Sequence, residues 1–362
     1  MNKEIKKRDW IGEYFTYPVS QEWRRKVKRR VKKAILITLS VTQVFLLGGC
    51  GSSKKKETQN QVTLVIDWSP NADHAGIYAA KEMGYFKDEG LDVKIERPIE
   101  EGAEKEVDRN KAQFGISYQD TLTDYITGDQ PLKIKSVAAL VQYSTAGILS
   151  RKGEGMDRPK GLEGKKYATW NWKIEKAMIE DVMTSNAGNY KKMIQIPNAV
   201  TDEVKALQNK ETDALFVYYQ NAGVLAKKEG LETDFFRFAD YNEKLAYYAP
   251  VLIANSDYLK SNGEQAKKVL KAIQKGYEYA MEHPEESAKI LCKEDSNLEQ
   301  DKVKEQISYL ADGKYIEKGK KWGEIDKDRW NGFYQWVNEK KLADSEIPKD
   351  AALDLSYLPS ES

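Results

Sequence analysis

The chain has 362 residues, and its 58 Lys and Arg side chains nearly balance 57 Asp and Glu side chains, for a formal net charge of +1. Residues 1–49 hold twelve basic and four acidic side chains, which leaves 46 against 53, a net −7, from residue 50 onward. An acidic folded part argues against a nucleic-acid-binding protein, and two cysteines with two histidines exclude a disulfide scaffold and a Cys-cluster metal site.

The N-terminal 49 residues are predicted to be a secretory signal peptide with an extension. The segment 34–47 is uncharged and follows a basic run at 26–33. Its 14 residues would rise about 21 Å as a helix, which is short of the ~30 Å hydrocarbon core of a membrane. A basic region, a short apolar region and small residues after it are typical of a signal peptide. We expect translation to begin downstream of residues 1–25.

The sequence Leu47-Gly-Gly-Cys50 ends this segment and resembles the lipobox of bacterial lipoproteins. The resemblance implies that Cys50 receives a diacylglycerol group and becomes the first residue of the mature protein. Residues 50–61 are polar and include Gly51, Ser52 and Ser53, which predicts a flexible tether. We therefore expect a protein that is lipid-anchored on the extracytoplasmic face of the cell membrane.

Strand-like and helix-like segments alternate from residue 62 onward, which predicts an α/β fold. Runs of apolar and β-branched residues predict strands at 62–68, 91–96, 114–118, 133–141, 166–169, 193–196, 214–218 and 251–254. Between them we expect helices at 71–87, 120–128, 174–184, 202–209 and 221–228. Helices alone follow the last strand, at 263–282, 285–293, 298–312 and 326–340.

Two lobes are predicted from the turn-forming stretches at 150–155 and 240–244. If the last strand returns to the first sheet, lobe one consists of 62–145 plus 248–345, lobe two is 146–247, and 346–362 is a C-terminal tail. The chain then crosses between the lobes twice, an arrangement that suits hinge closure around a ligand.

A family resemblance covers essentially all of 62–345. It rests first on Asp67-Trp-Ser-Pro-Asn-Ala-Asp-His-Ala-Gly-Ile-Tyr78 and on 84–93, and continues through 114–119, 140–147, 161–166, Trp170 with Glu175, 216–219 and 247–250. These segments are similar to solute-binding proteins of ABC importers related to the fungal thiamine-pyrimidine synthase. Within that family, the chain most resembles the bacterial binding proteins for formylaminopyrimidine, a thiamine precursor.

The resemblance implies the type II periplasmic-binding-protein fold, with two α/β lobes, two crossovers, a ligand cleft and a helical C-terminal region. It also implies a receptor that captures a pyrimidine of the formylaminopyrimidine or hydroxymethylpyrimidine type for uptake and salvage. The expected partners are the permease and ATPase subunits of the importer. We expect a monomer that is not an enzyme and needs no cofactor.

Three alternatives stay open at this point. The first is the synthase, which is disfavoured because Ser117 stands where the resemblance places its reactive lysine, and 245–250 lacks its cysteine-rich motif. The second is the same fold binding riboflavin or another flat heterocycle. The third is an anchored sensor that does not take part in transport.

The candidate ligand-binding residues lie at predicted strand ends or in loops, where an open α/β sheet places its crevice. They are Asp67, Trp68, Asn71, His74, Tyr118, Tyr143, Trp170, Glu175, Tyr218, Tyr219 and Tyr248. Aromatic side chains would stack on the flat ring, each pair contributing ~0.5–1.5 kcal/mol beyond area burial.

Polar side chains would recognise the edge of the ring. Glu175 or Asp67 could accept from the exocyclic amine, and Asn71 could donate or accept. Consecutive strand residues point to opposite faces, so we expect only one of Tyr218 and Tyr219 to line the cleft. For the same reason, we expect only one of Tyr247 and Tyr248 to line the cleft. No arginine lies in the matching segments, which disfavours an anionic ligand.

Overall fold

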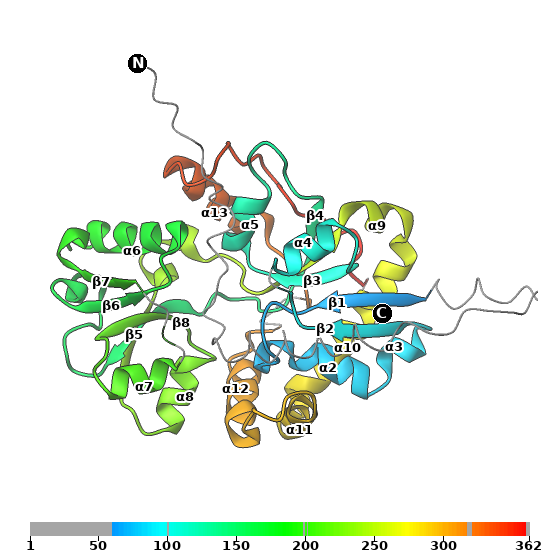
Figure 1. Cartoon of the computed structure of the whole chain (residues 1–362), viewed down its shortest axis with the longest axis horizontal. Coiled ribbons are helices and arrows are strands. Elements are labelled where there is room, and N and C mark those ends of the chain that lie inside the picture. Colours follow the sequence, from blue (N-terminus) through cyan, green and yellow to red (C-terminus); the bar gives the residue numbers. More distant parts are fainter. Residues whose placement is uncertain (1–59, 100, 198–199, 201, 317–320, 360–362) are drawn as a thin grey trace, which may run out of the picture. The chain divides into compact units, whose positions relative to one another are not determined.

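The computed structural model describes residues 60–359, except for 100, 198, 199, 201 and 317–320. The predicted signal peptide, Cys50 and nearly all of the tether lie outside these residues. Residues 60–98 and the part of the chain from 102 onward form one compact unit, which contains two mixed five-stranded sheets with helices packed around them (Figure 1). None of the described helices is long and apolar enough to cross a membrane.

The first sheet joins segments that are far apart in the sequence. Its strand order is β2-β1-β3-β10-β4. The strands are β1 (Gln61–Val65), β2 (Asp92–Glu96), β3 (Phe114–Ser117), β4 (Ile134–Ala139) and β10 (Val251–Asn255). Strand β1 pairs in parallel with β2 and β3, whereas β10 runs antiparallel between β3 and β4. The predicted return of the last strand to the first sheet is therefore observed.

The second sheet is built entirely from the middle of the chain, in the order β7-β6-β8-β5-β9. Its strands are β5 (Ala146–Arg151), β6 (Lys166–Thr169), β7 (Ile194–Pro197), β8 (Ala214–Tyr218) and β9 (Thr233–Arg237). Strands β5 and β9 were not predicted. Ser150 and Arg151, assigned to a turn-forming stretch, belong to β5, which is buried along its whole length between β8 and β9.

The helices agree closely with the sequence prediction. They are α2 (Ala75–Glu82), α3 (Tyr85–Asp88), α4 (Ala103–Asp108), α5 (Gln119–Tyr125), α6 (Lys173–Ser185), α7 (Glu203–Gln208), α8 (Ala222–Lys228), α9 (Ser256–Ser261), α10 (Gly263–Glu282), α11 (Pro284–Glu294), α12 (Gln300–Asp312) and α13 (Lys327–Glu339). Helices α4 and α9 were missed. The helix predicted at 71–87 is divided, because Gly84 adopts a φ of 81° between α2 and α3.

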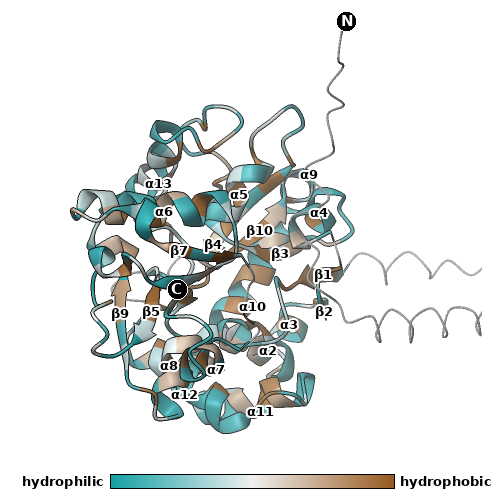
Figure 2. Cartoon of the chain, turned by 60° about the vertical axis from the view of Figure 1, so that its left-hand side comes forward, coloured by the Kyte–Doolittle hydropathy of each residue, from teal (hydrophilic) through white to brown (hydrophobic). Residues whose placement is uncertain are grey.

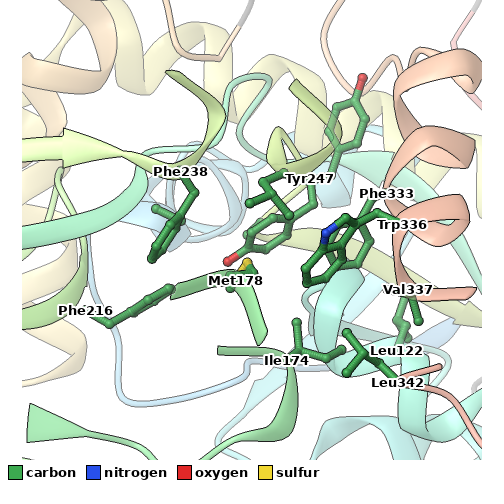
Figure 3. Close-up of a cluster of buried hydrophobic side chains, with 14 of the residues drawn as sticks. Leu122, Ile174, Met178, Phe216, Phe238, Tyr247, Phe333, Trp336, Val337 and Leu342 are labelled. Atoms are coloured by element: carbon green, nitrogen blue, oxygen red, sulfur yellow. The ribbon is translucent and has the colours of Figure 1, made fainter. Parts of the chain in front are cut away.

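We use "lobe one" for the described residues of 60–145 and 248–359, and "lobe two" for those of 146–247. Figure 2 shows hydrophilic and hydrophobic residues alternating along the helices around the sheets, as expected for amphipathic helices. One apolar cluster is continuous between the lobes (Figure 3). Ile174 and Met178 of α6 belong to it together with Trp336 and Leu342 of lobe one. Apolar burial thus links α6 of lobe two to α13 of lobe one.

Helices α2 and α10 pack closely through two glycines. A Cβ atom added to Gly276 would lie 2.0 Å from the Gly76 carbonyl oxygen, and one added to Gly76 would lie 2.2 Å from the Tyr277 ring. The Tyr277 hydroxyl donates to the backbone oxygen of Asp73 at 2.6 Å, so the ring is held in place. This contact fixes the position of the turn that precedes α2.

We expect Gly276→Ala to lower the free energy of unfolding by about 1–3 kcal/mol, because the added methyl group overpacks a close helix contact. Gly332→Ala is the matched control, since Gly332 lies in α13 and an added Cβ would meet no atom within 4 Å. That change should stabilise the protein by about 0.5–1 kcal/mol. Urea denaturation measures both, and equal effects of the two substitutions would contradict the packing argument.

Candidate functional site

Asp67 is held by two side chains from other parts of lobe one. His74 Nε2 lies 2.7 Å from Asp67 Oδ1, and the Tyr118 hydroxyl donates to Oδ2 at 2.5 Å. The backbone N–H of Asn71 donates to His74 Nδ1 at 3.3 Å. Because Nδ1 accepts there, the geometry assigns the imidazole proton to Nε2, which donates to Asp67. Asn71 also caps the 3₁₀ turn Ala72–His74 through its side-chain oxygen.

The environment of Asp67 favours its ionised form. Burial alone would raise the pKa of this carboxyl, but the interactions with His74 and the hydrogen bond from Tyr118 outweigh burial and lower it below its usual value. The side chain keeps 13% of its surface exposed. Its two oxygens offer about four acceptor positions, and these two side chains fill two of them. Asp67 can therefore accept further hydrogen bonds.

Tyrosines from both lobes meet beside this carboxylate. The rings of Tyr118 and Tyr218 are stacked, with centroids 5.6 Å apart and planes at 20°. Tyr218 ends β8 in lobe two, and its hydroxyl lies 3.2 Å from that of Tyr247. We call Asp67, His74, Tyr118, Tyr218 and Tyr247 the lobe junction. It combines one ionised carboxylate with aromatic faces, as small-molecule sites do.

A second polar contact joins the lobes next to the lobe junction. The Gln220 side-chain amide of lobe two donates to both carboxylate oxygens of Asp73, at 3.1 and 3.3 Å. The Thr145 hydroxyl donates to Gln220 Oε1, which fixes the orientation of the amide. All three side chains are buried. Burial raises the pKa of Asp73 to about 6, although the Gln220 hydrogen bond acts in the opposite direction.

Glu175 organises the loop that carries Trp170. Its carboxylate accepts four hydrogen bonds, from the Tyr167 hydroxyl at 2.6 Å, the Thr169 hydroxyl at 3.1 Å and the backbone N–H groups of Trp170 and Trp172, both at 3.3 Å. Burial raises its pKa. Trp170 and Trp172 stack on each other, with centroids 5.5 Å apart. The four donors fill the acceptor positions of Glu175, so in this conformation it positions the loop.

Tyr143 and Tyr248 lie around a guanidinium group. The Arg329 side chain lies over the Tyr248 ring at 3.6 Å from its centroid, and it is 5.5 Å from the centroid of Tyr143. The Tyr248 hydroxyl accepts the backbone N–H of Asp326 at 2.7 Å. Tyr248 is fully buried in lobe one, and its neighbour Tyr247 is the member of the pair that contacts Tyr218.

The two remaining predicted aromatic residues have different surroundings. Trp68 follows the first strand, and 49% of its surface is exposed. The Tyr219 ring packs on Phe235, at 4.6 Å between centroids, and on Tyr309 of α12, at 5.3 Å. Tyr218 and Tyr219 thus have different neighbours, as the alternation of strand side chains predicts.

Asp73, Gln220 and Tyr247 are residues of interest that the sequence analysis did not select. Asp73 lies within the segment that carries the family resemblance, so its position could have drawn attention to it. Nothing in the pattern of the sequence distinguishes Gln220 or favours Tyr247 over Tyr248. Within the described part of the chain, no three His, Cys, Asp or Glu side chains gather in a way that could hold a metal ion.

Comparisons with known proteins agree with this architecture. The family model described as "NMT1/THI5 like" matches residues 71–287. The formylaminopyrimidine-binding protein of Halalkalibacterium halodurans is 24% identical over 84% of this chain and 94% of its own length. The 4-amino-5-hydroxymethyl-2-methylpyrimidine phosphate synthase THI11 of Saccharomyces cerevisiae is 26% identical over 62% of this chain and 68% of its own length.

Solved structures show the same fold. The ligand-binding component of an ABC-type import system from Staphylococcus aureus superimposes with a TM-score of 0.59. The match covers 83% of this chain and 98% of that protein, at 12% sequence identity. Together with the two five-stranded sheets, this match confirms the predicted type II periplasmic-binding-protein fold with its helical C-terminal region.

We expect the buried Asp73 carboxyl to make stability depend on pH. With a pKa near 6 when folded and 3.8 as its ordinary value, Asp73 binds more protons in the folded state than in the unfolded state between those values. The wild type should therefore lose stability as pH rises through this range, relative to Asp73→Asn, by up to roughly 3 kcal/mol.

Urea denaturation at several pH values measures this difference. Asp257→Asn is the control, because the exposed Lys133 lowers the pKa of Asp257 and the change should be small and of opposite sign. A stability difference between the wild type and Asp73→Asn that does not vary with pH would contradict the prediction.

Proposed function

The chain belongs to the NMT1/THI5-like family, and on this premise we propose that it is the solute-binding protein of an ABC importer for an aminopyrimidine precursor of thiamine. The observation that carries the proposal is the stacking of Tyr118 of lobe one on Tyr218 of lobe two, next to the ionised Asp67. Aromatic faces from two lobes suit a flat heterocycle, and a carboxylate suits its exocyclic amine.

Ligand capture requires the two tyrosine rings to separate. At 5.6 Å between centroids, Tyr118 and Tyr218 contact each other directly and leave no space for a third ring between them. Two connections join the lobes, at 140–145 and 238–250. We propose that rotation about these connections opens the lobe junction and that closure places the ligand between the rings.

A binding role is favoured over synthase activity by the residue at the end of β3. Ser117 is fully buried, and its hydroxyl donates to Glu104 Oε1 at 2.6 Å. A serine hydroxyl cannot form the Schiff base that the lysine of the synthase forms. The match to a formylaminopyrimidine-binding protein over 94% of its length also favours binding.

Export and lipid anchoring complete the proposed function. The proposal rests on the basic and apolar run at 26–47 and on the lipobox-like residues before Cys50. A receptor held at the outer face of the membrane would deliver its ligand to the permease, and the ATPase would drive uptake. We propose a monomeric receptor.

The ligand is tested by thermal unfolding of the purified protein with formylaminopyrimidine, hydroxymethylpyrimidine, thiamine and riboflavin. We expect both simple pyrimidines to raise the melting temperature, because a ligand at 100 times its Kd stabilises the folded state by about 2.7 kcal/mol. A shift with riboflavin alone would support the flat-heterocycle alternative. The absence of a shift with every pyrimidine would refute the proposed ligand class.

The same thermal unfolding assay tests whether the ligand binds at the lobe junction, with a variant of Tyr218. Tyr218→Ala should raise the Kd of the bound pyrimidine by about tenfold, because it removes one stacking face. Tyr241→Ala is the matched control, since Tyr241 is also partly buried in lobe two but packs on Phe236, at 5.6 Å between centroids. Equal losses in the two variants would argue against a ligand beside Tyr218.

The anchor is tested with Cys50→Ser in a bacterial host. We expect the wild type to be recovered with membranes and to incorporate radiolabelled palmitate, because the thiol is the site of lipid attachment. The variant should incorporate no label and leave the membrane fraction. Palmitate labelling of the Cys50→Ser protein would contradict the assignment, and Cys292→Ser serves as the control for the second thiol.

A further inference from the structure

Gln142, in the first connection between the lobes, is anchored to lobe one by three hydrogen bonds. Its backbone N–H donates to the carbonyl of Tyr315 at 2.6 Å, and its side-chain amide donates to the carbonyl of Glu324 at 2.8 Å. The Arg329 guanidinium donates to the backbone carbonyl of Gln142. Gln142 is also buried. The C-terminal region of lobe one therefore holds this residue of the connection in place.

Tyr248 anchors the second connection to lobe one in a similar way. Its backbone N–H donates to Gln119 Oε1, and its carbonyl accepts the backbone N–H of Gln119, both at 3.0 Å. Its hydroxyl accepts the backbone N–H of Asp326 at 2.7 Å. The Gln119 amide in turn donates to the carbonyl of Trp330 in α13, at 2.8 Å. Tyr248 is thus bonded to α5 and to the start of α13.

The Arg329 side chain joins these two anchors. Its guanidinium carbon lies 3.6 Å from the centroid of the Tyr248 ring and 5.5 Å from that of Tyr143, the residue after Gln142. A guanidinium can donate in its plane to the Gln142 carbonyl while its face stacks on a tyrosine. Its Nε is buried without a hydrogen-bond partner among the described residues, which is an unfavourable arrangement. The contacts with both connections give a reason for this position.

Lobe two anchors the first connection at Thr145. The Thr145 carbonyl accepts the backbone N–H of Tyr219 at 3.1 Å, and its hydroxyl donates to the Gln220 side chain. Both partners follow β8 of lobe two directly. Residues 143 and 144 therefore lie between the anchor on lobe one and the anchor on lobe two.

In the second connection, the anchor on lobe two is the 3₁₀ turn that ends at Ala246. A backbone hydrogen bond of 3.0 Å from the Ala246 N–H closes this turn. Asn242, which caps the turn, donates to Asp181 of α6 at 2.7 Å. Residues 246 and 247 therefore form the short link between this turn and the anchor on lobe one.

We propose that Arg329 is the brace of the interlobe hinge, which holds Gln142 and Tyr248 together so that the lobes rotate about residues 143–144 and 246–247. The inference rests on the proposed function, because ligand capture requires the lobes to separate. Arg329 acts through the two connections, so it is a positioning residue. It restricts rotation to movements that bring Tyr118 and Tyr218 back together.

Loss of the brace should weaken binding at a distance from the ligand. Without Arg329 the two connections are no longer held to each other, so the lobes of the open protein should sample more orientations. Apparent affinity falls in proportion to the fraction of molecules that are competent to bind. A wider range of open orientations makes that fraction smaller, and closure then costs more conformational entropy.

Pulsed EPR distance measurements test the brace in the absence of ligand. One spin label is placed on each lobe, at Lys260→Cys in α9 and Lys227→Cys in α8, with both native cysteines changed to serine. A second pair, Lys260→Cys and Lys87→Cys in α3, lies entirely within lobe one. All three lysines are exposed. The first pair reports rotation between the lobes, and the second reports any general loosening of lobe one.

Arg329→Met should broaden the interlobe distance distribution about twofold and leave the distribution within lobe one unchanged. Arg329→Lys keeps the charge but lacks the flat group that stacks and donates at once, so it should broaden the distribution less. Arg158→Met, at an exposed arginine of lobe two, is the matched control and should behave as the wild type. In calorimetry, Arg329→Met should raise the Kd of hydroxymethylpyrimidine by about 3- to 10-fold.

The outcomes separate the brace from the proposed function. Equal interlobe distributions in the wild type and Arg329→Met, or equal broadening of both label pairs, would overturn the brace. A wild type that binds no aminopyrimidine would overturn the proposed function, while the distance measurements still decide on the brace. Circular dichroism checks the fold of each variant. If Arg329→Met does not fold, Arg329→Lys decides, and a distribution as narrow as that of the wild type would then refute the proposal.

Discussion

The lobe junction depends on one partly buried carboxylate, Asp67, and on the two donors that keep it ionised. A buried charge without hydrogen-bond partners costs several kcal/mol, so the His74 imidazole and the Tyr118 hydroxyl must both be in place before Asp67 can be used for binding. The turn that carries His74 is held by the Asn71 cap and by the Tyr277 hydroxyl, which bonds to the Asp73 carbonyl. The close packing of α10 on α2 therefore helps to position Asp67 through three hydrogen bonds. These run from the Tyr277 hydroxyl to the Asp73 carbonyl, from the Asn71 N–H to His74 Nδ1, and from His74 Nε2 to Asp67.

Two of the contacts that hold the lobes together differ in physical character. The apolar cluster that includes Met178 and Trp336 is not directional, so it tolerates small rotations as long as the surfaces stay buried. The Gln220 amide on Asp73 is directional, and separation by about 1 Å would break it. Opening of the lobe junction would therefore break this hydrogen bond and the tyrosine stack first, while the apolar cluster remains in contact.

The sequence predicted most of the fold and part of the lobe junction. Helix α10 was predicted with its observed bounds because its amphipathic pattern is strong, whereas β5 was missed because its buried residues end in a polar, glycine-containing stretch. Asp67, Tyr118 and Tyr218 could be expected near each other because each follows or ends a strand at the same edge of its sheet. Gln220 could not, because its significance comes from Asp73, which the other lobe places beside it.

Three carboxyl groups near the predicted site show how neighbours decide the chemistry of one functional group. Glu175 accepts four hydrogen bonds and positions the loop that carries Trp170. Asp67 accepts hydrogen bonds from two side chains, remains an anion and can accept further hydrogen bonds. Among the described residues, only backbone N–H groups donate to Asp120, and burial raises the pKa of its carboxyl to about 7.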